Sequence, residues 1–126
     1  MEPIRELTKS ELQIMNAIWD KQKTTIYEIL EEFQNPKMAY STASTFVRIL
    51  VSKGYVGFEP NGKSYLYFPL ISRETYMDGF MAGVKDSFFK GSFKSMISFF
   101  AQKENLTQSQ YDNILSILNE NKKKSD

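Results

Sequence analysis

The chain has 126 residues, a formal net charge of +1 at pH 7, no cysteine and no histidine. This composition excludes disulfides, ordinary zinc sites and Ser–His or Cys–His catalytic pairs, and the sequence contains no nucleotide-binding glycine loop and no GxSxG motif. The length suits one domain, or one small domain with an appendage, and we expect no enzymatic activity, metal or cofactor. There is no run of 18 apolar residues and no apolar leader, so we expect a cytoplasmic protein without a membrane span.

Two helices are predicted in the first 36 residues, each opened by a capping box in which Thr is followed three residues later by Glu. The box at Thr8 opens a helix over residues 9–21, and the box at Thr25 opens a shorter one. Asn35-Pro36 ends the second helix. The apolar residues expected on the buried sides are Leu12, Met15, Ile18, Trp19, Ile26, Ile29, Leu30 and Phe33.

Residues 39–54, AYSTASTFVRILVSKG, form the helix around which the chain is organised, and Gly54 is its expected C-cap. The apolar stripe is formed by Ala43, Phe46, Val47 and Leu50. The opposite face carries Ser41, Ser44, Thr45, Arg48 and Ser52. A face of hydroxyls and one guanidinium suits close approach to phosphates and base edges. The alternative is a plain amphipathic helix with small exposed residues.

A hairpin is predicted directly after this third helix. Residues 55–58 and 64–69 are β-prone, and Asn61-Gly62 between them is a strong hairpin-turn signal. Three helices followed by a hairpin are the order of a winged helix whose recognition helix is the third, whereas a plain three-helix bundle needs no hairpin. Lys63 at the turn is a candidate contact to phosphate or to the minor groove, although the turn could simply close a small sheet.

Positive charge gathers around the predicted recognition helix. Residues 37–73 carry five cations and one anion, a net charge of +4, whereas residues 1–36 carry four cations and seven anions, a net charge of −3. A modest basic segment of this kind suits a dimer, which doubles its phosphate contacts, better than a monomer.

Three further helices are predicted over about residues 73–90, over residues 92–103 and after a capping box at Thr107. Their aromatic residues are too numerous to be covered by a small winged helix, which predicts a second copy of the chain as partner. An intramolecular three-helix core and a ligand pocket among the aromatic and Met residues are the alternatives. The expected dimer residues are Phe80, Val84, Phe88, Phe93, Ile97, Phe100, Ile114 and Leu118.

The predicted fold class is therefore mainly α with a small β-hairpin. Residues 1–71 are expected to form a winged helix-turn-helix domain that binds DNA, and residues 72–126 a helical dimerisation region.

Four segments resemble the penicillinase repressors, the BlaI/MecI type of winged-helix regulators, between about Leu7 and Asn119: LTKSELQIMNAIWD, AYSTASTFVRILVSKGYV, GKSYLYFPLIS and KSMISFFAQKENLT. The resemblance implies a homodimeric repressor of the β-lactamase and antibiotic-resistance type, in which each winged helix reads half of a palindromic operator in double-stranded DNA. The DNA-binding residues that it implies are Tyr40, Ser41, Thr42, Ser44, Thr45 and Arg48, with Lys63 on the wing.

Two departures from the family pattern concern induction. In antibiotic-responsive members, a membrane sensor protease system leads to cleavage of an Asn-Phe bond in the helix that aligns with residues 93–103. The matching pair here is Phe99-Phe100, a candidate cleavage site in which the Phe is kept and the Asn is lost. Copper-responsive relatives carry a C-terminal cysteine motif, which this chain lacks.

The sequence thus predicts a homodimeric repressor that occludes a palindromic operator. Two alternatives stay open: a winged-helix module that binds another protein through its aromatic C-terminal helices, and a regulator that binds a small molecule in the dimer region.

Overall fold

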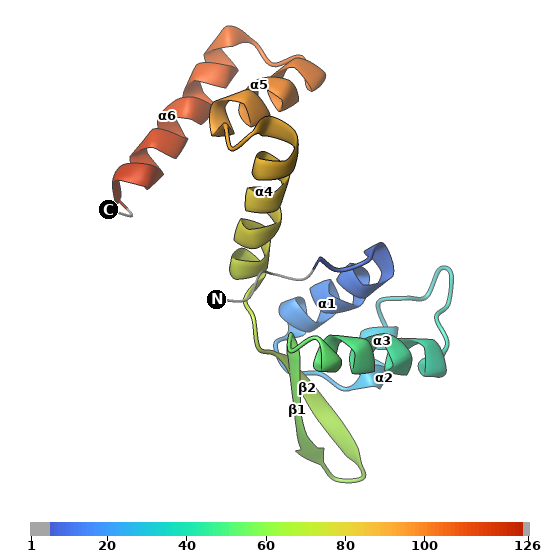
Figure 1. Cartoon of the computed structure of the whole chain (residues 1–126). Coiled ribbons are helices and arrows are strands. Elements are labelled where there is room, and N and C mark those ends of the chain that lie inside the picture. Colours follow the sequence, from blue (N-terminus) through green and yellow to red (C-terminus); the bar gives the residue numbers. More distant parts are fainter. Residues whose placement is uncertain (1–5, 125–126) are drawn as a thin grey trace. The chain divides into compact units, whose positions relative to one another are not determined.

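The computed structural model describes the backbone of residues 6–124 and the side chains of residues 6–117. Its elements are α1 (Lys9–Lys21), α2 (Ile26–Leu30), α3 (Tyr40–Ser52), β1 (Val56–Asn61), β2 (Ser64–Pro69), α4 (Arg73–Phe89), α5 (Phe93–Lys103) and α6 (Gln108–Lys124) (Figure 1). The predicted fold class, mainly helical with one hairpin, is confirmed. The chain divides into two compact units, Met1–Phe80 and Met81–Asp126, and the division falls inside α4. The functional domain limits expected at residues 71 and 72 stay a prediction.

The helices of the first unit begin where their capping signals predict. At α1 the capping box is complete, because the Glu11 amide donates to Thr8 Oγ1 at 3.2 Å and the Thr8 amide donates to Glu11 Oε1 at 2.8 Å. At α2 the Thr25 hydroxyl accepts from the Glu28 amide at 3.2 Å. α2 ends at Leu30 and not at Asn35-Pro36 as the sequence predicts, because residues 31 and 32 already form a turn.

The C-terminal end of α3 is a Schellman motif. The Tyr55 amide donates to the Leu50 carbonyl, and the amide of Gly54 donates to the Val51 carbonyl, both at 3.0 Å. Gly54 has φ +84°, a conformation that glycine adopts without steric cost. The predicted C-cap glycine is thus confirmed, and it turns the chain from α3 into the hairpin.

One hydrophobic core joins the elements of the first unit. It includes the predicted stripe of α3, in which Ala43, Val47 and Leu50 are fully buried and Phe46 is half-buried. The buried apolar residues of this core are Leu7, Ile14, Met15, Ala17, Ile18, Trp19, Ile26, Ile29, Ala43, Val47, Leu50, Tyr55, Val56 and Tyr76. Because the stripe faces this core, the hydroxyl-bearing side of α3 must face away from it.

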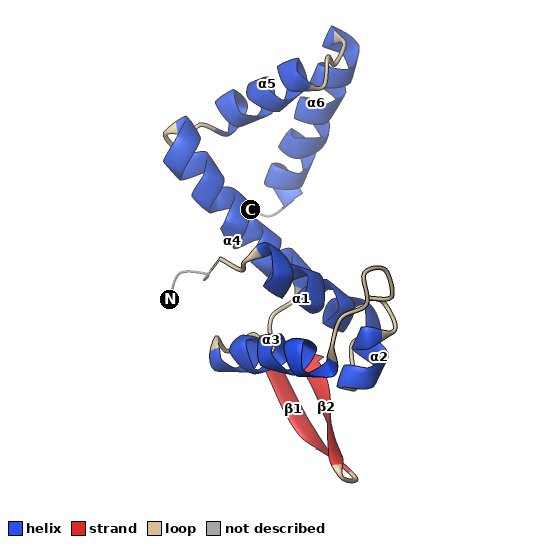
Figure 2. Cartoon of the chain, turned by 90° about the vertical axis from the view of Figure 1, so that its right-hand side faces the viewer, coloured by secondary structure: helices blue, strands red, loops and turns tan. Residues whose placement is uncertain are grey.

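The hairpin β1–β2 is antiparallel and stands beside α3 (Figure 2). Its two turn residues are Gly62 and Lys63, one position later than the Asn-Gly signal suggests, and Gly62 takes the positive φ (+63°) that this turn requires. Two hydrogen bonds between the backbones of Thr24 and Tyr67, at 2.8 and 3.0 Å, tie the hairpin to the loop between α1 and α2. The wing is therefore fixed at its base to the helical body.

The second unit has a much smaller core. Ser92 caps α5, and Thr107 and Gln110 form the predicted capping box at the start of α6. Among the described side chains of this unit, only Met96 and Ala101 are buried. Across the described part of the chain, no helix is both long enough and apolar enough to span a membrane.

Candidate nucleic-acid interface

The outer face of α3 carries the polar residues that the sequence singled out. Ser41, Thr42, Thr45 and Arg48 are exposed, and Ser44 is half-buried toward the hairpin. Within the described chain, α3 also differs from α1, α2 and α5 because its N-cap, Ala39, has no side chain that can accept a hydrogen bond. The outer face and the first turn of α3 thus present hydroxyls, a guanidinium and uncapped backbone amides to an external partner.

The hydroxyl of Thr45 has a defined hydrogen-bonding role. It donates to the carbonyl of Ser41, four residues earlier in α3, at 2.9 Å. Toward an external partner it can therefore only accept a hydrogen bond. The amino groups of adenine and cytosine in the major groove are donors of the required kind.

A groove separates α3 from the hairpin, with a volume of about 690 Å³. Its lining residues are Ile26, Tyr27, Tyr40, Ser44, Arg48, Val51, Phe58, Lys63, Ser64, Tyr65 and Tyr67. We call this the helix–hairpin groove. Among these described lining residues two are cationic, Arg48 and Lys63, and none is acidic. The groove therefore favours an anionic partner.

Aromatic rings form both walls of the helix–hairpin groove. On the helical side, the ring centroids of Tyr27 and Tyr40 lie 4.9 Å apart. On the hairpin side, Phe58 packs edge-to-face on Tyr65 at 5.3 Å and pairs across the strands with Tyr67. Burial raises the pKa of the Tyr67 hydroxyl, with smaller contributions from Tyr40 and Tyr65. A tyrosine is protonated at neutral pH even without this shift, so the hydroxyl can donate a hydrogen bond.

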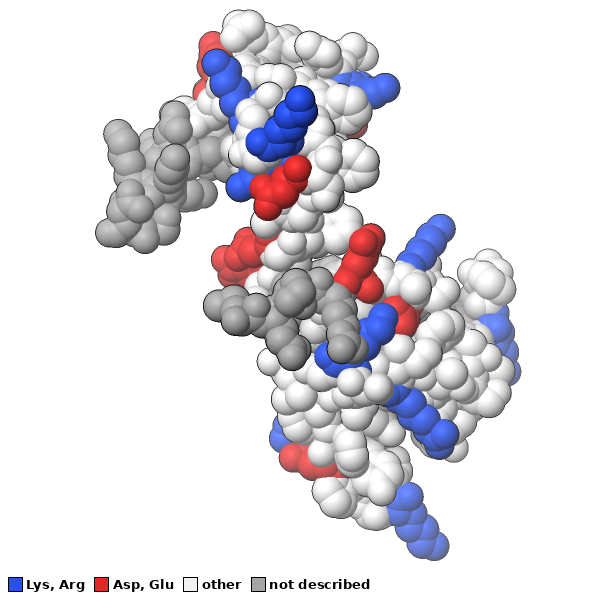
Figure 3. All heavy atoms as spheres, in the orientation of Figure 1, with Lys and Arg blue, Asp and Glu red and all other residues white. Residues whose placement is uncertain are grey.

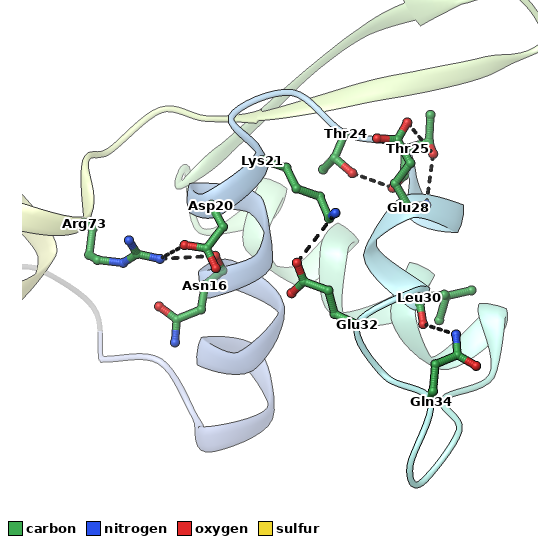
Figure 4. A network of polar contacts seen from close by, with 10 residues as sticks. All are labelled: Asn16, Asp20, Lys21, Thr24, Thr25, Glu28, Leu30, Glu32, Gln34 and Arg73. Carbon is green, nitrogen blue, oxygen red and sulfur yellow. Dashed lines mark hydrogen bonds and ion pairs between the residues drawn. The ribbon is translucent and has the colours of Figure 1, made fainter.

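The five cations of residues 37–73 do not form one positive surface, as their sequence positions suggested, because two of them pair with carboxylates. Lys53 Nζ lies 2.8 Å from Glu11 Oε1, and Arg73 pairs with Asp20 at 2.8 Å and donates to the Asn16 carbonyl (Figure 4). These two cations are neutralised on α1, so they add little to a DNA-binding surface.

The remaining cations of this segment are differently placed. Among the described residues, the structure gives no ion pair to Lys37, Arg48 or Lys63. Figure 3 shows cationic side chains over this part of the first unit, and one projects at the end of the hairpin. The positive surface is thus smaller than the net charge of residues 37–73 predicted, and it is centred on α3 and the hairpin.

Sequence reasoning missed four aromatic residues of the groove, Tyr27, Phe58, Tyr65 and Tyr67. A signal for the first was present, because Tyr27 stands next to the apolar stripe of α2 and outside its spacing. On β2, Tyr65 and Tyr67 are two residues apart and must share one face of the hairpin. What the spacing could not show is that α3 faces this side of the hairpin.

Within the described residues there is no cluster of three His, Cys, Asp or Glu side chains that would suit a metal ion. A hollow of about 460 Å³ between α5 and α6 is lined mainly by polar residues, including Ser98 and Gln102, together with the aromatic ring of Tyr111. None of the expected dimer residues whose side chains are described is among its lining residues.

Comparison with known proteins decides the family. The penicillinase repressor family model matches residues 7–120. The chain belongs to the penicillinase repressor family. The resemblance stated from four sequence segments is thus confirmed, and the match extends through most of α6 as well as the winged helix.

Two curated penicillinase repressor relatives match nearly the whole chain. The methicillin resistance regulatory protein MecI of Staphylococcus aureus (strain N315) is 28% identical over 115 residues, which cover 90% of this chain and 94% of the relative. The penicillinase repressor of Bacillus licheniformis is 24% identical over 123 residues, which cover 97% and 96%.

A solved structure of a relative matches 60% of this chain. It is the solution structure of the monomeric form of Bacillus licheniformis BlaI in complex with the blaP half-operator. The match has a TM-score of 0.50 and 25% identity, and it covers 60% of this chain and 94% of the solved one.

Proposed function

We propose that this chain is a homodimeric transcriptional repressor that binds a palindromic operator and blocks promoter access. The observation that carries the proposal is the outer face of α3, where hydroxyls and Arg48 stand beside a groove with cationic residues and no acidic ones. A relative with the same winged-helix arrangement has been solved on a half-operator. A regulator of this kind is not an enzyme, and we expect it in the cytoplasm with the DNA.

In the proposed complex, α3 lies in the major groove and the hairpin lies beside it. Arg48 reads a base edge or holds a phosphate, the exposed hydroxyls contact base edges and phosphates, and Lys63 contacts the backbone near the minor groove. The residues assigned to DNA contact are Tyr40, Ser41, Thr42, Ser44, Thr45, Arg48 and Lys63.

The proposed dimer is formed through the C-terminal helices. Among the expected dimer residues, Phe80, Phe88, Phe93 and Phe100 are exposed. Val84, Ile97 and Ile114 are half-buried. The side chain of Leu118 lies outside the described residues. Since the second unit buries so little of its own apolar surface, a second copy is the economical partner.

Dimer formation should be lost when charge is placed on this surface. Phe88 is 78% exposed, so Phe88→Glu should leave the folded chain intact while raising the dimer dissociation constant about tenfold or more. Sedimentation velocity across a concentration series measures this change. Ser95→Glu, at an exposed polar position of α5, is the matched control and should remain dimeric. A monomeric wild-type chain would contradict the dimer.

The proposal as a whole is tested by gel shift with the DNA upstream of the chain's own gene. A discrete shifted band is expected, weaker at the higher of two salt concentrations because counterions compete for the phosphates. Footprinting should place the bound region on a palindrome. A chain that shifts no DNA, or shifts every fragment equally at both salt concentrations, would favour a protein-interaction module instead.

Cleavage at Phe99-Phe100 by a membrane sensor protease system is a further part of the proposal. Both side chains are nearly half exposed, but the bond lies inside α5. Because proteases act on extended backbone, cleavage requires local unfolding of this helix, which few buried contacts oppose.

A further inference from the structure

We propose that the helix–hairpin groove also binds a small aromatic carboxylate, which displaces operator DNA from α3 and so induces transcription. The displacement rests on the proposed repressor function, whereas the binding of the carboxylate does not.

The size of the groove fits a small molecule. Its volume of about 690 Å³ lies within the usual range of ligand sites, about 300–1,000 Å³. The walls come from α2, α3 and both strands, and the base of the hairpin is held by the hydrogen bonds between Thr24 and Tyr67. The hairpin wall is therefore anchored at its base to the loop between α1 and α2.

The walls select a planar ring. Tyr27 is 67% exposed and Phe58 is 52% exposed, although both are large rings with neighbouring rings to pack on. A flat aromatic molecule between the two walls would cover rings on both sides. Contacts between aromatic rings would stabilise its binding beyond what the burial of apolar area contributes.

The polar lining selects an anion. Arg48 and Lys63 are cations without an ion-pair partner among the described residues, and Ser44 and Ser64 offer hydroxyl donors. Tyr67 also lines the groove, and its hydroxyl is a further donor because a tyrosine is protonated at neutral pH. A neutral ring would leave the cations without a partner, and a bare inorganic anion would leave the aromatic walls exposed. A carboxylate on an aromatic ring satisfies both.

Competition with DNA follows from the shared residues. Arg48 and Lys63 are assigned to DNA contact and also line the groove. A carboxylate that pairs with Arg48 removes that cation from the phosphates or bases, so binding of one partner lowers the affinity for the other. The regulatory site therefore lies in the DNA-binding unit and not in the dimer region.

The binding step is tested with 2-naphthoate and the full-length chain, by equilibrium dialysis. Phe58→Ala should weaken binding about tenfold, because it removes one aromatic wall. The matched control is Leu70→Ala, which truncates a side chain that is 60% exposed and does not line the groove. Tyr27→Ala tests the opposite wall if the Phe58 variant does not fold. The neutral analogue 2-naphthalenemethanol should bind about tenfold more weakly, because it lacks the charge.

The release step is tested by adding 2-naphthoate to the operator gel shift. The shifted band should disappear over the same concentrations that saturate the groove in dialysis. The inference is wrong if the chain binds operator but does not bind 2-naphthoate. It is also wrong if Phe58→Ala and Tyr27→Ala bind 2-naphthoate as tightly as the wild type does. If 2-naphthoate binds as expected and no operator shift is seen without it, the repressor proposal fails while the site stands.

Discussion

Replacing Arg48 with Ala is expected to weaken operator binding by about 1–3 kcal/mol per recognition helix, which is roughly 5- to 150-fold. Arg48 is exposed on the outer face of α3, four residues from Ser44 and one turn after it. In the described structure no carboxylate neutralises it, so its full charge is available to the operator that we propose it binds. Fluorescence anisotropy with a labelled operator measures the loss.

Two versions of this contact give different results. If Arg48 reads a base, Arg48→Ala weakens the operator more than unrelated DNA, because a bidentate base contact is sequence-specific. If it holds a phosphate, both DNAs lose affinity equally, and the salt dependence falls by about one unit of slope per contact. Lys94→Ala, which removes a cation from α5, is the control for net charge and should bind as wild type. Unchanged binding of Arg48→Ala to every DNA would refute both versions.

The second large effect concerns stability. Lys53→Ala is expected to destabilise the first unit by about 3 kcal/mol, because it leaves the Glu11 carboxylate buried without its cation. Only 5% of the Glu11 side chain is exposed, compared with 22% of Lys53. The expected loss of stability lies at the low end for buried ion pairs, because solvent already reaches the ammonium group of Lys53. Urea denaturation followed by Trp19 fluorescence measures the change.

A surface pair of similar length is the matched control. Lys23 Nζ lies 2.9 Å from Glu59 Oε1, but 61% of the first side chain and 43% of the second are exposed. Lys23→Ala should therefore cost less than about 1 kcal/mol. Equal losses for Lys23→Ala and Lys53→Ala would show that the burial of Glu11 does not determine the effect.

The pair formed by Glu11 and Lys53 also makes the stability of the fold depend on pH. Burial raises the pKa of Glu11, but hydrogen bonds from Lys53 and from Thr8 outweigh it, so the pKa lies below its ordinary value of 4.5. A carboxyl whose pKa is lowered on folding stabilises the fold fully above its unfolded pKa and loses this effect as pH falls through the folded value. The stability difference between wild type and Glu11→Gln should therefore be constant near neutral pH and shrink in acid below about pH 4.5. A difference that grows in acid would contradict this sign.

The local signals of the sequence were sufficient for the elements. The capping boxes at Thr8 and Thr107, the glycine at position 54 and the apolar spacing of α3 each depend on residues within one or two turns. Such signals act through short-range hydrogen bonds and periodicity, so they can be read without tertiary structure. The hydroxyl face of α3 followed from the same periodicity, and the family from segments spread along most of the chain.

Local signals could not show which cations share one surface or what the exposed aromatic residues contact. Segment counting placed Lys53 and Arg73 in one basic surface, but their partners Glu11 and Asp20 lie 42 and 53 residues away on α1. The exposed aromatic residues of the second unit suggested a partner surface, and whether that partner is a second copy stays a prediction.

The sequence by itself determined the order and kind of the elements, the outer face of α3 and the family, because each depends on neighbouring residues or on similarity along the chain. Only the tertiary structure decided which cations of residues 37–73 have no ion pair among the described residues, and that Tyr27, Arg48 and Tyr65 line one groove. These residues come from α2, α3 and β2, and packing on a common core, not their spacing in the chain, brings them together.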